Sequence, residues 1–112
     1  MQQLEDIKTL VIDDEQVLAW SIETHLKQHG ADVAKAHTAE DARRTFESFD
    51  PDVVICDIKL PDGSGLDLLK EFKAKNPQLP VILITAHGAI DTAINAVRLA
   101  AFDYLQKPFD LK

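Results

Sequence analysis

The sequence predicts a doubly wound α/β fold in which helices cover both faces of a five-stranded parallel sheet. Short apolar runs rich in Val and Ile lie at residues 10–12, 53–56 and 81–84, and a weaker run covers residues 101–106. Runs of this kind are typical of strands that are buried on both faces. Helical patterns separate the runs, as in a series of β-α-β units. We therefore expect five strands, four helices and right-handed crossovers.

The first helix is predicted at residues 16–29, directly after the first strand. Its apolar residues recur at every fourth position, and Gly30 follows as a typical helix stop. The recurring residues are Leu18, Ile22 and Leu26. A second strand is expected at about residues 32–36, where a short and weakly apolar sequence is typical of an edge strand.

The second helix is predicted to begin at residues 38–41. The sequence Thr-Ala-Glu-Asp at these positions resembles a capping box with aspartate in the acidic position. Ala42 and Phe46 then lie on the inner face of the helix. Beyond the third strand, residues 61–65 are rich in Pro, Asp and Gly and predict a turn.

The third helix follows this turn and ends at residues 76–77, where Asn precedes Pro. Its inner face carries Leu66, Leu69 and Phe72. The fourth strand is expected at residues 80–85, and the helix after it has apolar positions at Ile90, Ala93, Ile94 and Val97. No fifth helical pattern follows before Lys112. We expect residues 1–112 to be one domain, the N-terminal fragment of a longer protein, without the last helix of a doubly wound sheet.

Composition narrows the classes of function. The formal net charge is -7 and no block of Lys or Arg is present, so direct binding of nucleic acid or an anionic membrane by this domain is not expected. The single cysteine, Cys56, cannot form an internal disulfide and lies in a predicted core strand. The sequence shows neither a signal peptide nor a membrane-spanning apolar segment. These features predict a cytoplasmic location.

Polar residues stand at the carboxyl ends of the predicted strands. Asp13 and Asp14 follow the first strand and Asp57 ends the third. Thr85 ends the fourth strand, and Lys107 follows the fifth. Parallel strands bring their carboxyl ends to one edge of the sheet, where open α/β sheets bind ligands. Three carboxylates gathered there repel each other unless a hard divalent cation joins them, and such oxygen ligands favour Mg²⁺. The pattern predicts a phosphorylation site built around this metal.

Each of these residues also has a simpler interpretation. Taken alone, Asp13 and Asp14 are typical caps of the following helix. Lys107 is equally compatible with a solvated charge, and Thr85 with an ordinary β-branched strand residue. Tyr104, the only tyrosine, could be a half-buried aromatic residue of the last strand. Their predicted convergence on one edge favours a joint site over these separate roles.

In their order and position these motifs resemble the receiver domain of response regulators in two-component systems. The resemblance spans the whole chain. It is carried by the acidic pair after the first strand, Asp57 at the end of the third, Thr85-Ala86 at the end of the fourth, and Tyr104 with Lys107-Pro108 around the fifth. Any one of these motifs is weak, whereas all of them in order at strand ends are specific.

The resemblance implies a flavodoxin-like fold with strand order 2-1-3-4-5. It also implies that Asp57 accepts a phosphoryl group, with Mg²⁺ as cofactor, and so becomes an aspartyl phosphate. The implied metal ligands are Asp13, Asp14, Asp57 and the backbone carbonyl of Lys59. Thr85 is implied as the switch hydroxyl, Tyr104 as the switch aromatic residue and Lys107 as the cation that pairs with the phosphoryl group. Such a domain is not an enzyme, but it assists its own phosphorylation and dephosphorylation.

A finer resemblance concerns the output of the switch. Trp20 and residues 85–88 and 101–110 resemble receivers attached to sigma-54-dependent (NtrC-like) activators, which carry an AAA+ module. The implied partners are a sensor histidine kinase, a covalently linked output domain that regulates transcription, and a second copy of the chain. His25, His29, His37 and His87 are expected on surface segments or loops, without a catalytic role.

Two other classes of protein are weighed against this interpretation. A Mg²⁺-dependent phosphatase of the haloacid dehalogenase type also uses an aspartate at a strand end, but it needs a second acid two residues later, where this chain has Lys59. A flavodoxin-like nucleotide or flavin module needs a Gly-rich or Ser/Thr-rich phosphate loop after the first strand. This chain has acidic residues 13–15 there, which repel phosphate unless a metal intervenes.

Overall fold

The computed structural model describes residues 7–85 and 103–106. A parallel sheet forms its centre, with strands β1 (Lys8–Ile12), β2 (Asp32–Ala36), β3 (Val53–Asp57), β6 (Val81–Thr85) and β7 (Asp103–Gln106). The strand order is β2-β1-β3-β6-β7, and every pair in this sheet is parallel. The predicted five strands and their order 2-1-3-4-5 are confirmed. The predicted fourth helix lies outside the described residues.

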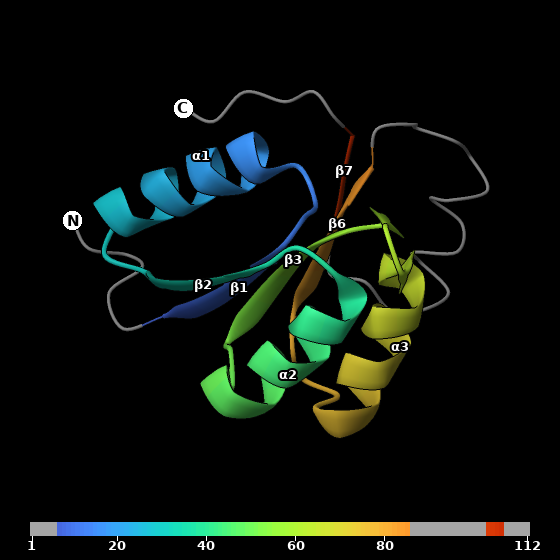
Figure 1. Ribbon diagram of the computed structural model, residues 1–112. Helices are drawn as coiled ribbons and strands as arrows, with labels where there is room; N and C mark the ends of the chain where they lie inside the picture. Colours follow the sequence, from blue (N-terminus) through green and yellow to red (C-terminus); the bar gives the residue numbers. More distant parts are fainter. Residues whose placement is uncertain (1–6, 86–102, 107–112) are drawn as a thin grey trace.

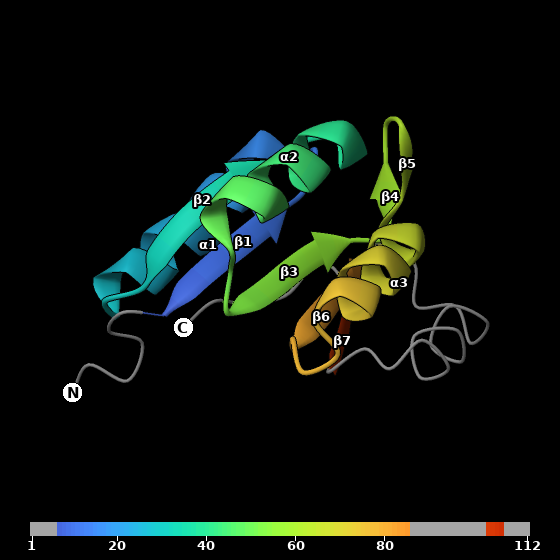
Figure 2. The same ribbon diagram turned by 90° about the horizontal axis from the view of Figure 1, so that it is seen from below.

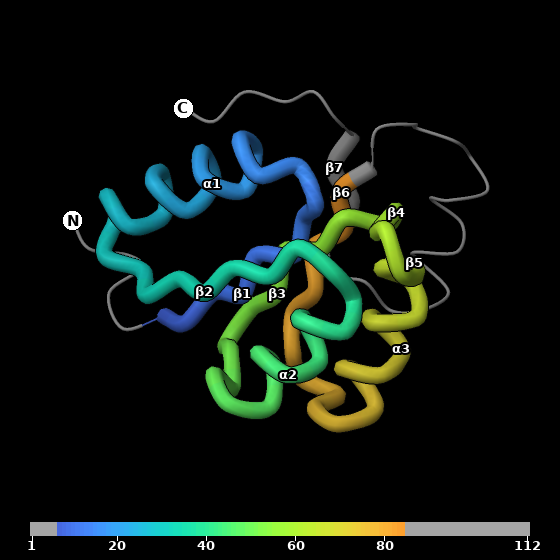
Figure 3. The backbone as a smooth tube through the Cα atoms, viewed as in Figure 1, coloured from blue at the N-terminus to red at the C-terminus, as the bar shows by residue number. Residues whose placement is uncertain are grey.

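The described helices cover both faces of the sheet, as Figures 1 and 2 show. Helix α1 (Gln16–Gln28) lies on one face, and α2 (Ala39–Phe49) and α3 (Gly65–Lys75) lie on the other. The predicted bounds of α1, the predicted start of α2 and the predicted end of α3 agree with the structure to within one or two residues. Figure 3 follows the chain from β1 through α1 and back to β2 at the edge of the sheet. Among the described residues, no helix combines the length and apolar character needed to cross a bilayer.

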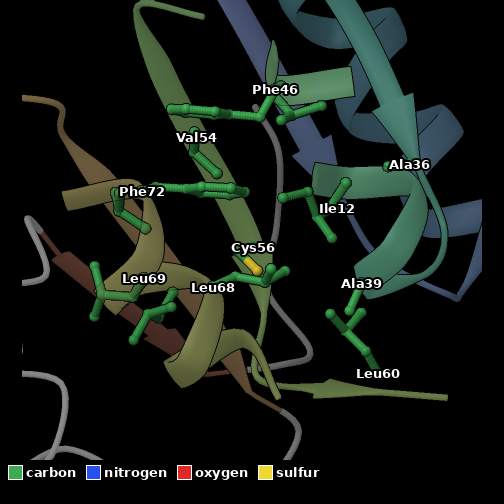
Figure 4. Packing of buried hydrophobic residues seen from close by; sticks show 14 of the residues in the cluster. Ile12, Ala36, Ala39, Phe46, Val54, Cys56, Leu60, Leu68, Leu69 and Phe72 are labelled. Carbon is green, nitrogen blue, oxygen red and sulfur yellow. The ribbon is translucent and has the colours of Figure 1, made fainter. Parts of the chain in front are cut away.

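The larger part of the core lies between the sheet and the pair α2 and α3. The rings of Phe46 and Phe72 stack there with centroids 4.0 Å apart, and Val54 and Cys56 of β3 lie beside them (Figure 4). A smaller cluster on the other face joins Val11 and Ile84 to α1, where Ala19 and Ile22 are buried. Both faces are therefore apolar, which explains why the strands read as continuous apolar runs.

Helix α2 begins at the predicted cap. The Thr38 hydroxyl accepts a hydrogen bond from the N–H of Asp41 at 3.0 Å. Two further N–H groups of the first turn, those of Ala39 and Glu40, donate hydrogen bonds to the carboxylate of Asp62, which lies far away in the sequence. The amino end of α2 is thus held partly by a residue outside the helix.

The segment after β3 differs from the prediction of a simple turn. Residues 59–64 form a small antiparallel hairpin of β4 (Lys59–Leu60) and β5 (Gly63–Ser64), which is separate from the main sheet. Figure 2 shows it projecting beyond the carboxyl end of β3. Strands of two residues carry no periodic pattern, so the sequence shows the turn chemistry and not the pairing around it.

Candidate functional site

Three aspartates meet where β1 and β3 end. Asp13 and Asp14 follow β1 directly, Asp57 is the last residue of β3, and the register pairs Ile12 with Cys56 just before them. One carboxylate oxygen from each aspartate lies within 4.8 Å of the others. The carboxyl ends of two neighbouring strands therefore bring three acidic groups to one point, as the sequence predicts.

Asp13 is the fully buried member of this cluster, with 0% of its surface exposed. Its N–H donates to the carbonyl of Ala36 at 3.0 Å, its Oδ1 accepts from the N–H of Glu15 at 2.9 Å, and its carbonyl accepts from Nδ1 of His37 at 2.8 Å. The N-cap position of α1 is Glu15, whose side chain makes no capping bond. Neither Asp13 nor Asp14 occupies the N-cap position of α1, and Asp13 instead binds the N–H of the N-cap residue.

Asp57 is held at the end of β3 and is only 5% exposed. Its Oδ1 accepts a hydrogen bond from the N–H of Lys59 at 3.2 Å. The N–H of Ile58, the residue directly after Asp57, donates to the carbonyl of Ile84 at 3.0 Å and so extends the pairing of β3 with β6. These bonds fix the backbone that directly follows Asp57. Asp14, in contrast, is exposed to solvent.

Cys56 is next to the cluster but does not contribute a ligand atom. Its buried thiol donates to the carbonyl oxygen of Asp57 at 3.3 Å. Burial raises the pKa of this thiol strongly, and the negative charges of Asp57 and Asp13 raise it further. The raised pKa keeps Cys56 protonated. Because only a thiolate is a good nucleophile or metal ligand, Cys56 is a core residue without a chemical role in the cluster.

The amino end of α3 packs directly against the backbone of Asp57. The N–H of Gly65 donates to the carbonyl of Ile58 at 2.7 Å. A β carbon at Gly65 would lie 2.2 Å from the carbonyl oxygen of Asp57, which is far inside van der Waals contact. The close approach of helix and strand at this point therefore depends on the missing side chain of glycine.

The donor atoms of the cluster suit a hard divalent cation. All three are carboxylate oxygens, and three carboxylates this close together repel each other unless a cation is bound. Imidazole and thiolate ligands, which transition metals prefer, are absent from this group of described residues. The residues present fit a cation that binds oxygen ligands.

Two further predicted site residues lie in the neighbouring strands. Thr85 is the last residue of β6, one position beyond Ile84, which is the register partner of Asp57. Tyr104 lies in β7 and pairs in register with Leu83. Thr85 is therefore at the carboxyl end of β6, whereas Tyr104 lies in the first half of β7. Lys107 lies outside the described residues, as does His87.

Three residues on or near the cluster make contacts that the sequence did not reveal. His37 was expected on the surface without a role, yet it is half-buried and binds the carbonyl of Asp13. Gly65 and Asp62 were assigned only to a turn, yet one touches the backbone of Asp57 and the other binds α2. The contacts of His37 and Asp62 join segments more than 20 residues apart, and that of Gly65 depends on a missing side chain, so no local pattern predicts them.

Comparisons with known proteins agree with this geometry. Residues 9–112 match the family described as response regulator receiver domain. The NtrC protein of Proteus hauseri, a DNA-binding transcriptional regulator, is 43% identical over 101 residues, which are 90% of this chain and 21% of the relative. The response regulator protein PilR of Pseudomonas aeruginosa is 41% identical over 104 residues, which are 93% of this chain and 23% of the relative. The chain spans about a fifth of the length of these relatives.

Solved structures show the same architecture. A response regulator of Burkholderia pseudomallei, determined with a phosphorylated aspartic acid, calcium ion and citrate, superposes with a TM-score of 0.88 at 30% identity and covers 95% of this chain and 62% of that chain. The beryllofluoride-activated NtrC4 receiver domain dimer gives a TM-score of 0.86 at 33% identity, covering 92% of this chain and 85% of that chain.

The likeness to receivers of the NtrC group is confirmed by these relatives, and the two other classes of protein weighed above are not favoured. Strand order, the acidic cluster at the ends of β1 and β3, and the match over residues 9–112 agree with one another. The chain belongs to the response regulator receiver domain family, whose members are phosphorylation-dependent signalling switches.

Proposed function

We propose that Asp57 is the phosphoacceptor of this domain and that a sensor histidine kinase is the phosphodonor. The observation that carries the proposal is the cluster of Asp13, Asp14 and Asp57, whose carboxylate oxygens lie within 4.8 Å of one another at the end of β3. Asp57 is the member at the strand end, its carboxylate accepts from the N–H of Lys59, and the following N–H, that of Ile58, is bound to the carbonyl of Ile84. A rigidly held carboxylate is a suitable acceptor for in-line transfer, because positioning supplies much of the catalysis in phosphoryl transfer.

The metal expected at this cluster is Mg²⁺. Its ligands would be Asp13, Asp14, Asp57 and the backbone carbonyl of Lys59, which is the first residue of β4. Bound Mg²⁺ neutralises the carboxylates and the oxygens of the arriving phosphoryl group. The all-oxygen donor set supports this choice, since Mg²⁺ prefers hard ligands and commonly retains waters.

The reaction asks little covalent chemistry of the protein. A carboxylate oxygen of Asp57 attacks the phosphorus of the phosphohistidine, the bond between phosphorus and nitrogen breaks, and the imidazole keeps the electron pair. Hydrolysis of the resulting aspartyl phosphate returns the carboxylate. The domain assists both steps by holding Asp57 in place, but Asp57 itself accepts the phosphoryl group, so the domain is a phosphoacceptor and not an enzyme.

We propose that phosphorylation of Asp57 changes the conformation of residues in β6 and β7. The new phosphoryl group adds charge and three acceptor oxygens next to the end of β6. Thr85 is expected to hydrogen-bond this group, Lys107 to pair with it, and Tyr104 to change orientation in response. Such a local change acts as a signal when it shifts a two-state equilibrium of the fold.

The output is proposed to be transcriptional. The relatives NtrC and PilR are named as regulators, and the chain covers only about a fifth of each. We propose that residues 1–112 belong to a longer cytoplasmic protein with an output domain, possessing an AAA+ module and a DNA-binding part. A homodimer of receivers is a further proposal, supported by the dimeric state of the NtrC4 receiver.

The central test is labelling of Asp57. Incubation with acetyl phosphate and Mg²⁺ is expected to add one phosphoryl group to the wild type and none to Asp57→Asn, because the amide is not nucleophilic. Intact-mass spectrometry measures the adduct. Asp32→Asn is the matched control, since Asp32 is exposed at the opposite end of the sheet in β2, and it should be labelled like wild type. Equal labelling of Asp57→Asn and wild type would overturn the assignment.

Metal binding should depend on the exposed aspartate of the cluster. Asp14→Ala is expected to lose most of its affinity for Mg²⁺ in calorimetric titration, because a charged oxygen ligand is removed. Without Mg²⁺ the same variant should melt at a higher temperature than wild type, since repulsion within the cluster is relieved. With Mg²⁺ the wild type should gain stability and the variant should not. Unchanged Mg²⁺ affinity in Asp14→Ala would refute its role as a ligand.

A further inference from the structure

The hairpin that follows Asp57 is attached to a helix that precedes it in the chain. The carboxylate of Asp62, in the turn between β4 and β5, accepts two hydrogen bonds from the amino end of α2. Oδ1 accepts from the N–H of Ala39 at 2.6 Å, and Oδ2 accepts from the N–H of Glu40 at 3.1 Å. Both are backbone groups that a helix cannot satisfy internally.

Asp62 and the N-cap residue Thr38 together bind the N–H groups in the first turn of α2. The hydroxyl of Thr38 accepts from the N–H of Asp41 at 3.0 Å, so the N–H groups of the first three residues of α2 all have acceptors. The negative charge of Asp62 also lies at the positive end of the helix dipole. The hydrogen bonds from Ala39 and Glu40 lower the pKa of Asp62, so this carboxylate is ionised at neutral pH.

Packing reinforces the attachment on the same side of the hairpin. Leu60 is buried and lies beside Ala39 in Figure 4. A β carbon at Gly63 would come within 3.3 Å of the Ala39 side chain, so the hairpin backbone passes close to the start of α2. The hydrogen bonds of Asp62 therefore join two surfaces that already touch.

The other end of the same hairpin begins at the phosphorylation site. Lys59, the first residue of β4, donates its N–H to Oδ1 of Asp57 at 3.2 Å, and Lys59 pairs with Ser64 across the hairpin. Ser64 in turn caps α3 by accepting from the N–H of Leu66 at 3.1 Å. Asp62 holds the free tip of a hairpin whose base carries groups of the site.

We propose that Asp62 is a positioning residue for the phosphorylation site. By fixing the tip of the β4 and β5 hairpin to the amino end of α2, it sets the backbone of Lys59 beside Asp57. The inference rests on the proposed role of Asp57 and adds a residue that touches neither the phosphoryl group nor the metal. Its loss should therefore alter the geometry of the site and not remove the acceptor.

The test compares Asp62→Ala with Thr38→Ala. Both remove an acceptor from the first turn of α2, but only Asp62→Ala releases the hairpin. Asp62→Ala is expected to weaken Mg²⁺ binding by roughly tenfold, the lower end for loss of a group that orients a metal ligand, and to slow labelling by acetyl phosphate at saturating Mg²⁺. Thr38→Ala should lower the melting temperature comparably while leaving Mg²⁺ affinity unchanged. Calorimetry, intact mass and thermal melting supply the three readouts.

A conservative variant separates positioning from simple destabilisation. Asp62→Asn keeps one carbonyl oxygen that can accept from Ala39 and should recover part of the Mg²⁺ affinity. Amide hydrogen exchange at Ala39 and Glu40 should accelerate in Asp62→Ala and less in Asp62→Asn. If Asp62→Ala binds Mg²⁺ like wild type, or if Thr38→Ala weakens Mg²⁺ binding equally, Asp62 only stabilises the helix and the proposal fails. Labelling of Asp57→Asn would instead refute the acceptor, and the Mg²⁺ comparison would still decide the role of Asp62.

Discussion

Gly65→Ala is expected to destabilise the fold by roughly 2–3 kcal/mol, the upper range for overpacking, and to slow phosphorylation of Asp57 strongly. The added β carbon would lie 2.2 Å from the carbonyl oxygen of Asp57 and 2.9 Å from the Cα of Ile58. These are backbone atoms at the end of β3, so no side-chain rotation can relieve the clash. The start of α3 and the phosphoacceptor strand must move apart.

The cost at this position is steric and not conformational. Among the described residues, Gly30 is the only glycine with positive φ, so the backbone at Gly65 suits any residue. Alanine is also a better helix former than glycine, so a loss of stability on Gly65→Ala would come from the steric contact. Urea unfolding and the initial rate of labelling by acetyl phosphate measure the two effects.

Gly63→Ala is the matched control for this experiment. Its β carbon would approach the side chain of Ala39 at 3.3 Å, a contact that a small shift relieves. We expect a change below about 1 kcal/mol, in the range of tolerated core changes. A Gly65→Ala variant as stable and as rapidly labelled as Gly63→Ala would show that α3 does not constrain the backbone of Asp57.

Phe72→Ala is expected to cost about 3–5 kcal/mol of unfolding free energy, as is usual for removal of a buried phenylalanine. The Phe72 ring is 1% exposed and stacks on Phe46 with an interplanar angle of 4°. Truncation would leave a cavity between α3 and β3 and would remove the stacked pair. The urea midpoint should fall with an unchanged m-value.

Phe72→Leu separates the loss of volume from the loss of stacking. Leucine fills most of the space, so the cost should fall to about 1–2 kcal/mol, as for other modest core changes. A double-mutant cycle with Phe46→Leu should give a coupling of about 0.5–1.5 kcal/mol, the usual value of an aromatic pair. A loss below 1 kcal/mol in Phe72→Ala would mean that other contacts hold α3 to the sheet.

Much of the fold could be predicted because long-range burial leaves a local trace. Strands covered on both faces must be apolar throughout, and β1, β3 and β6 lie where such runs occur. The order of the sheet places the ends of β1 and β3 side by side, so a sequence rule about strand ends was sufficient to predict the cluster of Asp13, Asp14 and Asp57. The roles of Thr85, Tyr104 and Lys107 stay predictions.

The rest of the site depends on contacts that leave no such trace. Nothing in the sequence near His37 indicates that its ring will bind the carbonyl of Asp13. Nothing near Asp62 indicates that its carboxylate will bind the first N–H group of α2, that of Ala39. The hairpin of β4 and β5 is too short for a periodic pattern. Gly65 reads as a turn residue, because a missing side chain does not reveal which backbone approaches it.

The position of β1 between β2 and β3 has a consequence for synthesis of the chain. Its neighbours are β2, which begins at Asp32, and β3, which begins at Val53. A growing chain therefore presents Leu10, Val11 and Ile12, all fully buried in the native sheet, with both strand edges unpaired until much later segments have been made. Nascent polypeptides with such exposed apolar strands are prone to aggregate and are substrates for chaperones. The strand that leads to Asp13 and Asp14 is thus prone to aggregation until β2 and β3 have been made.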